Sequence, residues 1–216
     1  MKKHTKIELS ILFGVLFAVF FTLAGFESKC DTIKNGVFRL RVVANSDTAY
    51  DQNIKLSVRD NILSCTSGLF KNAKSSKEAK NIAKNNLDII EKSVKDVLDK
   101  TGVKYDYKCL VKKEYFGTRD YDDFSLPAGE YDSLVVYLGN AKGHNWWCVL
   151  FPGVCLKTAG EKQKLEDVFS SEITDVTNNK EKYYLRFKSA EIYEYIKEKI
   201  KKYKNYNFFL AFFCLI

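Results

Sequence analysis

Apolar and basic side chains alternate between residues 37 and 44, which is the period-two pattern of a strand with one buried face. The polar turn that follows offers an N-cap at Ser46 or Asp47. Beyond it, apolar residues recur at helical spacing up to about Phe70. The pattern therefore predicts a strand, a capped turn and a helix in succession.

Patterns of both periods continue along the chain. Helical spacing from Ser75 onward predicts a second helix that ends at Gly102. The remaining predictions are strands at residues 103–111, 132–138, 147–156 and 183–187, helices at 162–171 and from a Ser189 cap to about 203, and loops at 117–129 and 139–145. This order predicts an α+β fold, a single compact domain in which a small sheet packs against helices.

The first 26 residues read as a leader. Lysines before Ile7 precede an apolar run from Leu9 to Phe26, which is typical of a segment that enters a membrane. Small residues near Ala24 offer a cleavage site, yet the run is close to the length of a spanning helix, so signal peptide and anchor both stay open. The positive-inside rule predicts export of the rest: a linker at 27–35, a folded domain at 36–205 and an apolar tail at 206–216.

The net charge of the chain and the distribution of its basic residues limit the classes of partner to be expected. The formal net charge of +8 is a mild excess for 216 residues, and no basic and aromatic module is recognisable, so nucleic acid is not expected as a partner. The densest basic stretch, residues 197–204, is best explained as a solvated helix face, with a contact to anionic lipid headgroups as the alternative.

Six cysteines are many for a chain of this size, and export makes disulfides permissible. Cys148 and Cys155 flank an apolar loop, and either a bridge between them or two buried thiols fits the spacing. The absence of a CxxC pair and the single histidine beyond the leader argue against a zinc site. The glycine loop at 139–143 lacks the GK[ST] ending of a phosphate loop, so no cofactor is predicted.

Rare residues are concentrated between Gly143 and Cys155, where His144 precedes the adjacent Trp146 and Trp147. Large aromatic side chains beside a glycine loop favour a binding surface, although alternation along a strand would point one tryptophan into the core. The alternative is an extracytoplasmic thiol or cell-wall hydrolase that uses His144 with Cys148. Apolar neighbours would raise the pKa of that thiol, which disfavours catalysis.

A second polar set brackets the first strand and helix. Arg59 can pair with Asp47 or Asp60 and fix the turn, an interpretation we favour over partner contact. The candidate partner-binding residues are Arg41, Asn45, Asp47, Arg59, Asp60, His144, Asn145, Trp146 and Trp147.

Several motifs are similar to those of the stage II sporulation protein R family: LRVVANSD at 40–47, Asp51-Gln52 with Lys55, Arg59-Asp60, LPAGEY at 126–131, and GHNWWCVLFP at 143–152 with Cys155. The resemblance covers about residues 38–198. Two departures stand out: Ala141 replaces a usual glycine, and Gly153-Val154 replaces a usual Pro-Leu. Both concern loop conformation and remove no polar group.

The resemblance implies an intercellular signal of endospore formation. Such a protein is made in the forespore and exported into the space between the forespore and mother-cell membranes. There it triggers a membrane-embedded aspartic protease, which removes the pro-sequence of a mother-cell sigma factor. The expected role is therefore that of an activating ligand with no catalytic residues of its own.

Overall fold

The alternating segment after the leader forms the strand around which the sheet is built. In the computed structural model, which describes the backbone of residues 3–121, 123–154 and 165–213, β1 (Phe38–Val43) is buried along almost its whole length. It lies inside a four-stranded sheet of order β2-β5-β1-β6, parallel to β5 and antiparallel to β6. The other strands are β2 (Tyr107–Phe116), β5 (Gly129–Leu138) and β6 (Asn145–Phe151).

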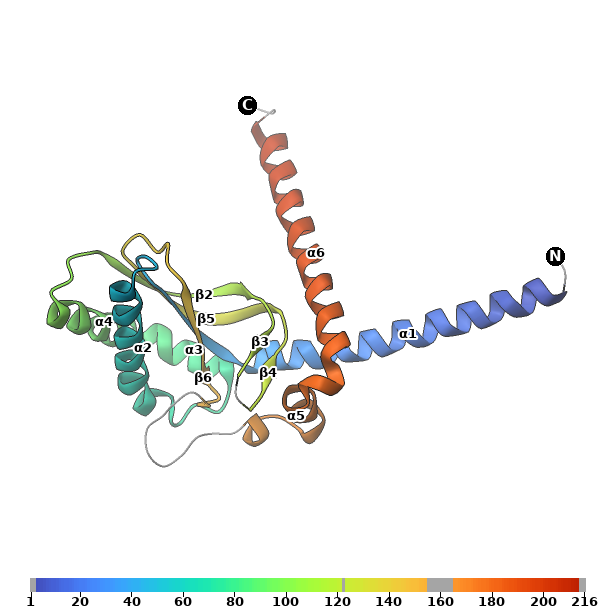
Figure 1. Ribbon diagram of the computed structural model, residues 1–216, viewed down its shortest axis with the longest axis horizontal. Helices are drawn as coiled ribbons and strands as arrows, with labels where there is room; N and C mark the ends of the chain where they lie inside the picture. Colours follow the sequence, from blue (N-terminus) through green and yellow to red (C-terminus); the bar gives the residue numbers. More distant parts are fainter. Residues whose placement is uncertain (1–2, 122, 155–164, 214–216) are drawn as a thin grey trace. The chain divides into compact units, whose positions relative to one another are not determined.

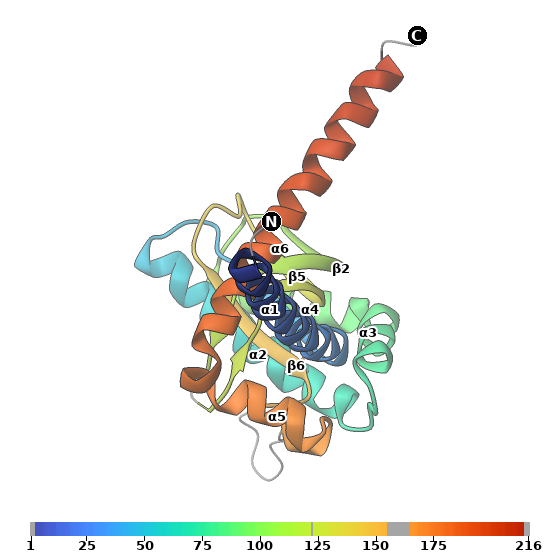
Figure 2. The same ribbon diagram turned by 90° about the vertical axis from the view of Figure 1, so that its right-hand side faces the viewer.

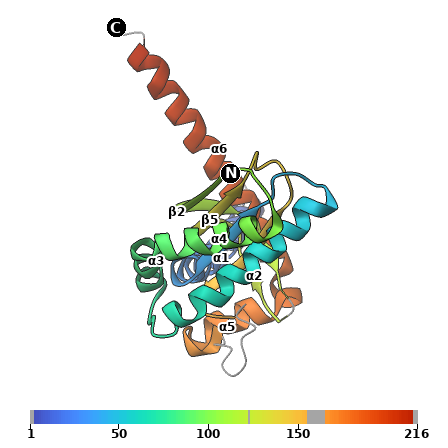
Figure 3. The ribbon, with the colours of Figure 1, turned by 90° about the vertical axis from the view of Figure 1, so that its left-hand side faces the viewer.

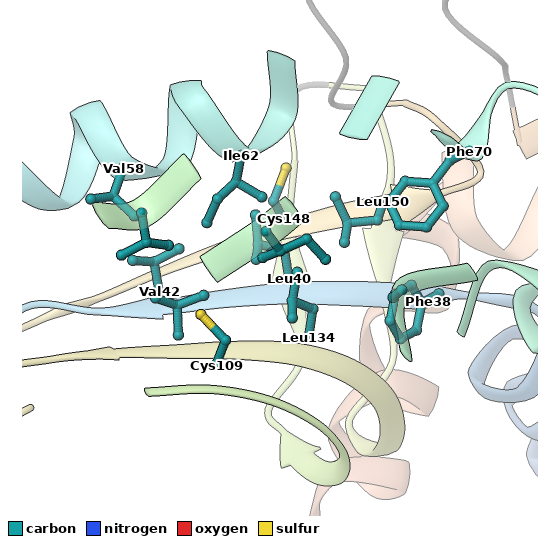
Figure 4. Close-up of a cluster of buried hydrophobic side chains, with 14 of the residues drawn as sticks. Phe38, Leu40, Val42, Val58, Ile62, Phe70, Cys109, Leu134, Cys148 and Leu150 are labelled. Carbon is teal, nitrogen blue, oxygen red and sulfur yellow. The ribbon is translucent and has the colours of Figure 1, made fainter. Parts of the chain in front are cut away.

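Three helices cover one face of this sheet: α2 (Ala49–Phe70), α3 (Ser76–Asn85) and α4 (Leu87–Thr101). Figure 3 shows α2 and α4 in front of the strands. The core between the layers is apolar: Leu40 and Leu134 on neighbouring strands face Ile62 of α2, as Figure 4 shows. This mixed sheet with its helical layer confirms the α+β prediction.

Local sequence signals set the helix ends, with two corrections. The cap of α2 is Thr48, whose hydroxyl accepts from the Asp51 backbone N–H, so Ser46 and Asp47 were the wrong caps. The predicted helix from Ser75 is two helices that break at Asn86, where the side chain bonds back to the Ile82 carbonyl. A left-handed Gly102 ends α4 as expected.

The chain divides into two compact units, whose helices and strands are labelled in Figure 1. The sheet unit comprises residues 34–116 and 130–174, and the terminal unit comprises residues 1–33, 117–129 and 175–216. The predicted domain limits stay predictions. The remaining elements are α1 (Lys3–Gly36), a two-stranded sheet of β3 (Arg119–Asp120) and β4 (Ser125–Leu126), a 3-10 turn (Leu165–Asp167), α5 (Ser171–Asn178) and α6 (Lys180–Phe213).

In the terminal unit, α6 is one continuous helix (Figure 2). The predicted strand at 183–187 is wrong, because these residues lie inside α6, and the helix begins at Lys180 instead of Ser189. Phe26 of α1 packs against α6 through the rings of Tyr183 and Phe187, at centroid distances of 6.0 and 5.5 Å. These aromatic residues are apolar contacts between helices and not a sheet face.

Among the residues that the structure describes, no helix is both long and apolar enough to cross a membrane. The leader at 1–26 and its cleavage stay predictions. The tail at 206–216 lies partly outside the described residues, and α6 continues through its first part to Phe213.

The sheet face opposite the helices is polar and aromatic. Arg39 is fully buried, and its guanidinium carbon lies 4.1 Å from the Phe116 ring centroid and 4.8 Å from that of Tyr131. A cation held between rings is attracted by their quadrupoles, most strongly where water is excluded. The arginines of the alternating segment are thus a second layer of packing and not a solvated face.

The β5–β6 turn contains the departure from the family pattern noted above. Ala141 adopts a φ of 51°, close to the 53° of Gly139 in the same turn. A left-handed conformation costs a residue with a Cβ about 1–2 kcal/mol, which explains a glycine there.

We therefore expect Ala141→Gly to raise the free energy of unfolding by about 0.5–1 kcal/mol, the relief of strain exceeding the added chain entropy. Urea denaturation of the full chain, at an unchanged m-value, measures this. Ala49→Gly, at the start of α2, serves as the control and should lower stability. A loss of stability in Ala141→Gly would contradict the strain argument.

Candidate functional site

Two loops meet at one edge of the sheet because of strand direction. β1 and β5 are parallel neighbours, so both end at this edge, and the antiparallel β6 starts there. Val43 pairs with Tyr137 on one side and Asn145 on the other. The loop after β1 and the loop after β5 therefore lie together, and we call residues 45–48 and 139–144 the loop tip.

Backbone hydrogen bonds join the two loops. The Gly143 N–H donates to the Ala44 carbonyl at 2.9 Å, and the Lys142 N–H donates to the Asn45 carbonyl at 3.2 Å. The Asn45 side-chain oxygen accepts from the Asn140 backbone N–H at 2.8 Å. A Cβ at Gly143 would overlap the Ser46 carbonyl oxygen, so the close approach requires glycine there.

Asp51, in the first turn of α2, is the anchor beneath the loop after β1. It is buried, and its Oδ2 accepts from the Ser46 hydroxyl at 2.6 Å and from the Asn45 amide at 2.8 Å. The Ser46 hydrogen bond lowers the pKa of Asp51, and the Asn45 bond adds to this against the opposing effect of burial. A charged carboxylate thus fixes the loop to the helix.

At the exposed end of the loop tip, Asp47 holds His144. One carboxylate oxygen accepts from the His144 backbone N–H at 2.6 Å and lies 2.5 Å from the ring Nδ1. The side chains are 80% exposed for His144 and 54% for Asp47. The backbone hydrogen bond and then the ring contact lower the pKa of Asp47. The imidazole is therefore presented to solvent in a fixed position.

Lys55 supports the same segment from α2. Its ammonium donates to the His144 carbonyl at 3.2 Å and to the Gln52 side-chain oxygen at 2.5 Å. Gln52 in turn donates to the Ser46 carbonyl at 2.9 Å. Lys55 is buried, and the resulting desolvation lowers its pKa. One helix thus braces both loops.

The two tryptophans point to opposite faces of the sheet, as alternation predicts, and both are partly buried. Trp146 packs on the apolar core, with the Arg59 guanidinium carbon 4.2 Å from its ring centroid. Trp147 lies on the other face, 4.8 Å from the Phe116 ring and 4.8 Å from Arg41. Each ring is held by protein groups on its own face.

Paired charges fix both arginines that cover these rings. Arg41 donates to the Asn145 side-chain oxygen at 3.0 Å and pairs with Glu114 at 2.6 Å. Arg59 pairs with Asp60 at 2.7 Å, so of the two predicted partners the structure selects Asp60. Arg41, Asn45, Asp47, His144 and Asn145 come together at the sheet edge, whereas Arg59 and Asp60 lie on α2.

The geometry is unfavourable for a His144–Cys148 dyad. Four residues of extended strand separate the two positions by about 13 Å. Cys148 is buried opposite Leu40 in the apolar core, while the His144 ring is exposed at the loop tip. A base and nucleophile must be within hydrogen-bond reach, which this arrangement prevents. The predicted disulfide partner, Cys155, lies outside the described residues.

No predicted site residue belongs to a metal-like cluster in the described part of the chain. The group of carboxylates found there, Glu27, Asp31 and Glu194, lies in the terminal unit, and Lys197 donates to Glu194 at 3.1 Å.

Sequence reasoning missed four residues that build the site: Asp51, Gln52, Lys55 and Asn140. The first three are part of the family motif, and that was the available signal. Nothing local marks Asn140, because its contact with Asn45 joins positions far apart in the chain.

Replacing Gly143 with Ala should lower the free energy of unfolding by about 2 kcal/mol, because the new Cβ would meet backbone that cannot move aside cheaply. Urea denaturation checks this. Gly68→Ala is the matched control. Gly68 lies in α2, and a Cβ there would meet no atom within 4 Å, so the higher helix propensity of alanine should raise the free energy of unfolding by about 0.5–1 kcal/mol. Equal changes in the free energy of unfolding for the two variants would refute the close approach of the two loops at Gly143.

A pH prediction follows from Asp51. Its pKa in the folded state is below the ordinary 3.8, so its contribution is present above that value and is lost as pH falls through the folded pKa. Asp51→Asn should destabilise the protein near pH 7 and flatten the acid limb of its stability profile below about pH 4. Urea midpoints across pH test this, with the exposed Asp96→Asn as control. An unchanged acid limb in Asp51→Asn would count against the anchor.

The chain is similar to known proteins along most of its length. Residues 34–161 match the family described as stage II sporulation protein R. A stage II sporulation protein R of Bacillus subtilis (strain 168) is 32% identical over 165 residues, which cover 72% of this chain and 74% of that protein. No solved structure matches the chain. The motif resemblance is confirmed, and the chain belongs to the stage II sporulation protein R family.

Proposed function

We propose that this protein is an exported signal of endospore formation, made in the forespore and active in the space between the forespore and mother-cell membranes. It activates a membrane-embedded aspartic protease, which then processes a mother-cell pro-sigma factor. Membership of the stage II sporulation protein R family carries this proposal. The basic and apolar leader supports export.

The loop tip is the surface best suited to recognise the protease. Its backbone and side chains are already ordered by Asp51, Asn45 and Lys55, so little conformational entropy remains to be lost on binding. The exposed imidazole of His144, held in place by Asp47, offers a ring nitrogen for a hydrogen bond to the partner. The tryptophans serve as packing beneath this surface, since each is partly buried against neighbours of its own face.

The contact of Asp47 with Nδ1 leaves the other ring nitrogen, Nε2, for a partner. In the neutral ring with Nδ1 protonated, Nε2 accepts a hydrogen bond, and in the protonated ring it donates one. A ligand shifts a receptor between two states only through a difference in affinity for them. The loop tip would therefore contact groups that the active protease places differently from the inactive one.

Reconstitution in vegetative cells tests the proposal: the full chain is co-expressed with the protease and the pro-sigma factor, and processing is scored by immunoblot. Wild type should trigger processing. His144→Ala should reduce it about tenfold at an unchanged protein level, as for a central contact residue. The exposed Lys95→Ala on α4 serves as the matched surface control and should process normally.

Further variants separate the alternatives. Trp146→Ala/Trp147→Ala should lower the protein level, because both rings are part of the packing. If it accumulates normally but fails to signal while His144→Ala signals, the tryptophans are the contact and the loop tip is not. Normal signalling by Cys148→Ser would discard the thiol-hydrolase alternative. No processing with wild type would overturn the proposed function.

A further inference from the structure

In the part of α6 whose side chains the structure describes, one apolar side packs within the terminal unit and a second apolar side is exposed. Tyr183, Phe187 and Ala190 are buried, and the first two pack on Phe26 of α1. At 100° per residue these positions share one side of the helix. A surface helix needs only this one apolar stripe to pack.

The opposite side carries a second apolar stripe, which we call the apolar ridge: Leu185, Ile192, Ile196 and Ile200. These side chains are 80%, 60%, 50% and 52% exposed. Their spacings of seven, four and four residues keep them in line along the side opposite Phe187. Ser189 interrupts this row between Leu185 and Ile192. Exposed branched aliphatic residues gathered on one side of a helix indicate a surface that is covered by something else.

Cations border the apolar ridge on both sides. Arg186 and Lys197 follow one edge, and Lys188 and Lys199 follow the other. All four are exposed. Lys188 and Lys197 also pair with Glu191 and Glu194 on the same helix, each at 3.1 Å. Between residues 182 and 204 the sequence has eight basic residues against three acidic ones, so a net positive excess remains along the helix.

Tyrosines lie at the same borders. Tyr193 and Tyr195 are both more than half exposed, and Lys197 and Lys199 lie over their rings at 5.6 and 5.4 Å. Aromatic rings with a polar end, beside lysines with long apolar stems, are typical of the boundary between hydrocarbon and headgroups. The sequence beyond adds lysines up to Lys204 and then turns apolar from Phe208.

A second copy of this chain fits the apolar ridge less well than a lipid surface. Pairing of two such helices would bring cationic borders together, and like charges along a seam repel. The spacing also lacks the alternation of three and four residues that a coiled coil requires. An anionic surface neutralises these cations and covers the ridge at once.

We propose that α6 is an interfacial helix that lies on an anionic lipid bilayer, with the apolar ridge in the acyl boundary and its lysine and arginine borders among the headgroups. The opposite face of the helix keeps its packing on Phe26. The contact of the apolar ridge with lipid does not involve the receptor. It can therefore be disproved while the proposed signalling function stands, and the signalling function can be disproved while the lipid contact stands.

Amide hydrogen exchange of the full chain tests this, because it reads α6 separately from the leader. The chain is reconstituted into vesicles of phosphatidylcholine alone or of an equimolar mixture with phosphatidylglycerol. Peptides covering residues 185–200 should exchange about tenfold more slowly in the anionic vesicles, as expected from burying several aliphatic groups. Peptides from the sheet unit should not change between the two compositions.

Two variants make the result specific. Ile192→Ser/Ile196→Ser should abolish the slowing, with vesicle-free exchange of α6 showing that the helix still forms. Lys197→Glu/Lys199→Glu should do the same, whereas Lys92→Glu/Lys95→Glu on α4, with the same change in net charge, should not. Equal protection in both vesicle types would overturn the proposal. Protection that depends on protein concentration without vesicles would assign the ridge to self-association instead.

Discussion

The carboxylate of Asp51 is the group on which the end of the sheet depends. It lies in the first turn of α2 and receives hydrogen bonds from Ser46 and Asn45, so one buried charge joins the helix to the loop before it. Asn45 also links the two loops, because its side-chain oxygen accepts a hydrogen bond from the Asn140 backbone N–H in the other loop. A buried carboxylate is tolerated only with such partners, and removing one of them leaves a buried acceptor with fewer donors, which costs free energy.

Strand direction and this charge act together. Parallel β1 and β5 bring two loops to one edge, and the hydrogen bonds from Gly143 and Lys142 then set how β6 enters beside β1. Because side chains alternate along a strand, that entry also decides which tryptophan faces the core. A shift by one residue would exchange Trp146 and Trp147 and place Cys148 on the arginine-rich face. The loop tip is therefore part of what defines the sheet register.

Local patterns predicted several elements but not what covers them. The strand within 37–44, the stripe ending at Phe70 and the stop at Gly102 are confirmed, but the prediction that β1 buries only one face is wrong, because Arg39 is fully buried on the other face. The segment at 183–187 failed because aromatic residues favour strands locally, whereas here Tyr183 and Phe187 are one helical turn apart and share Phe26. The site was predictable in residue identity but not in arrangement: Glu114 and Asn140 reach Arg41 and Asn45 across long stretches of sequence.

The proposed functions of the two units complement each other. A signal that acts between closely apposed membranes meets its receptor more often if it stays at a lipid surface, because confinement raises the effective concentration of one partner near the other. The apolar ridge of α6 would supply that confinement without using the loop tip. The loop tip would then need only modest affinity for the receptor, and its polar groups could serve to distinguish the active from the inactive state. An exposed, preorganised histidine edge suits this task better than a large apolar patch, which would bind both states alike.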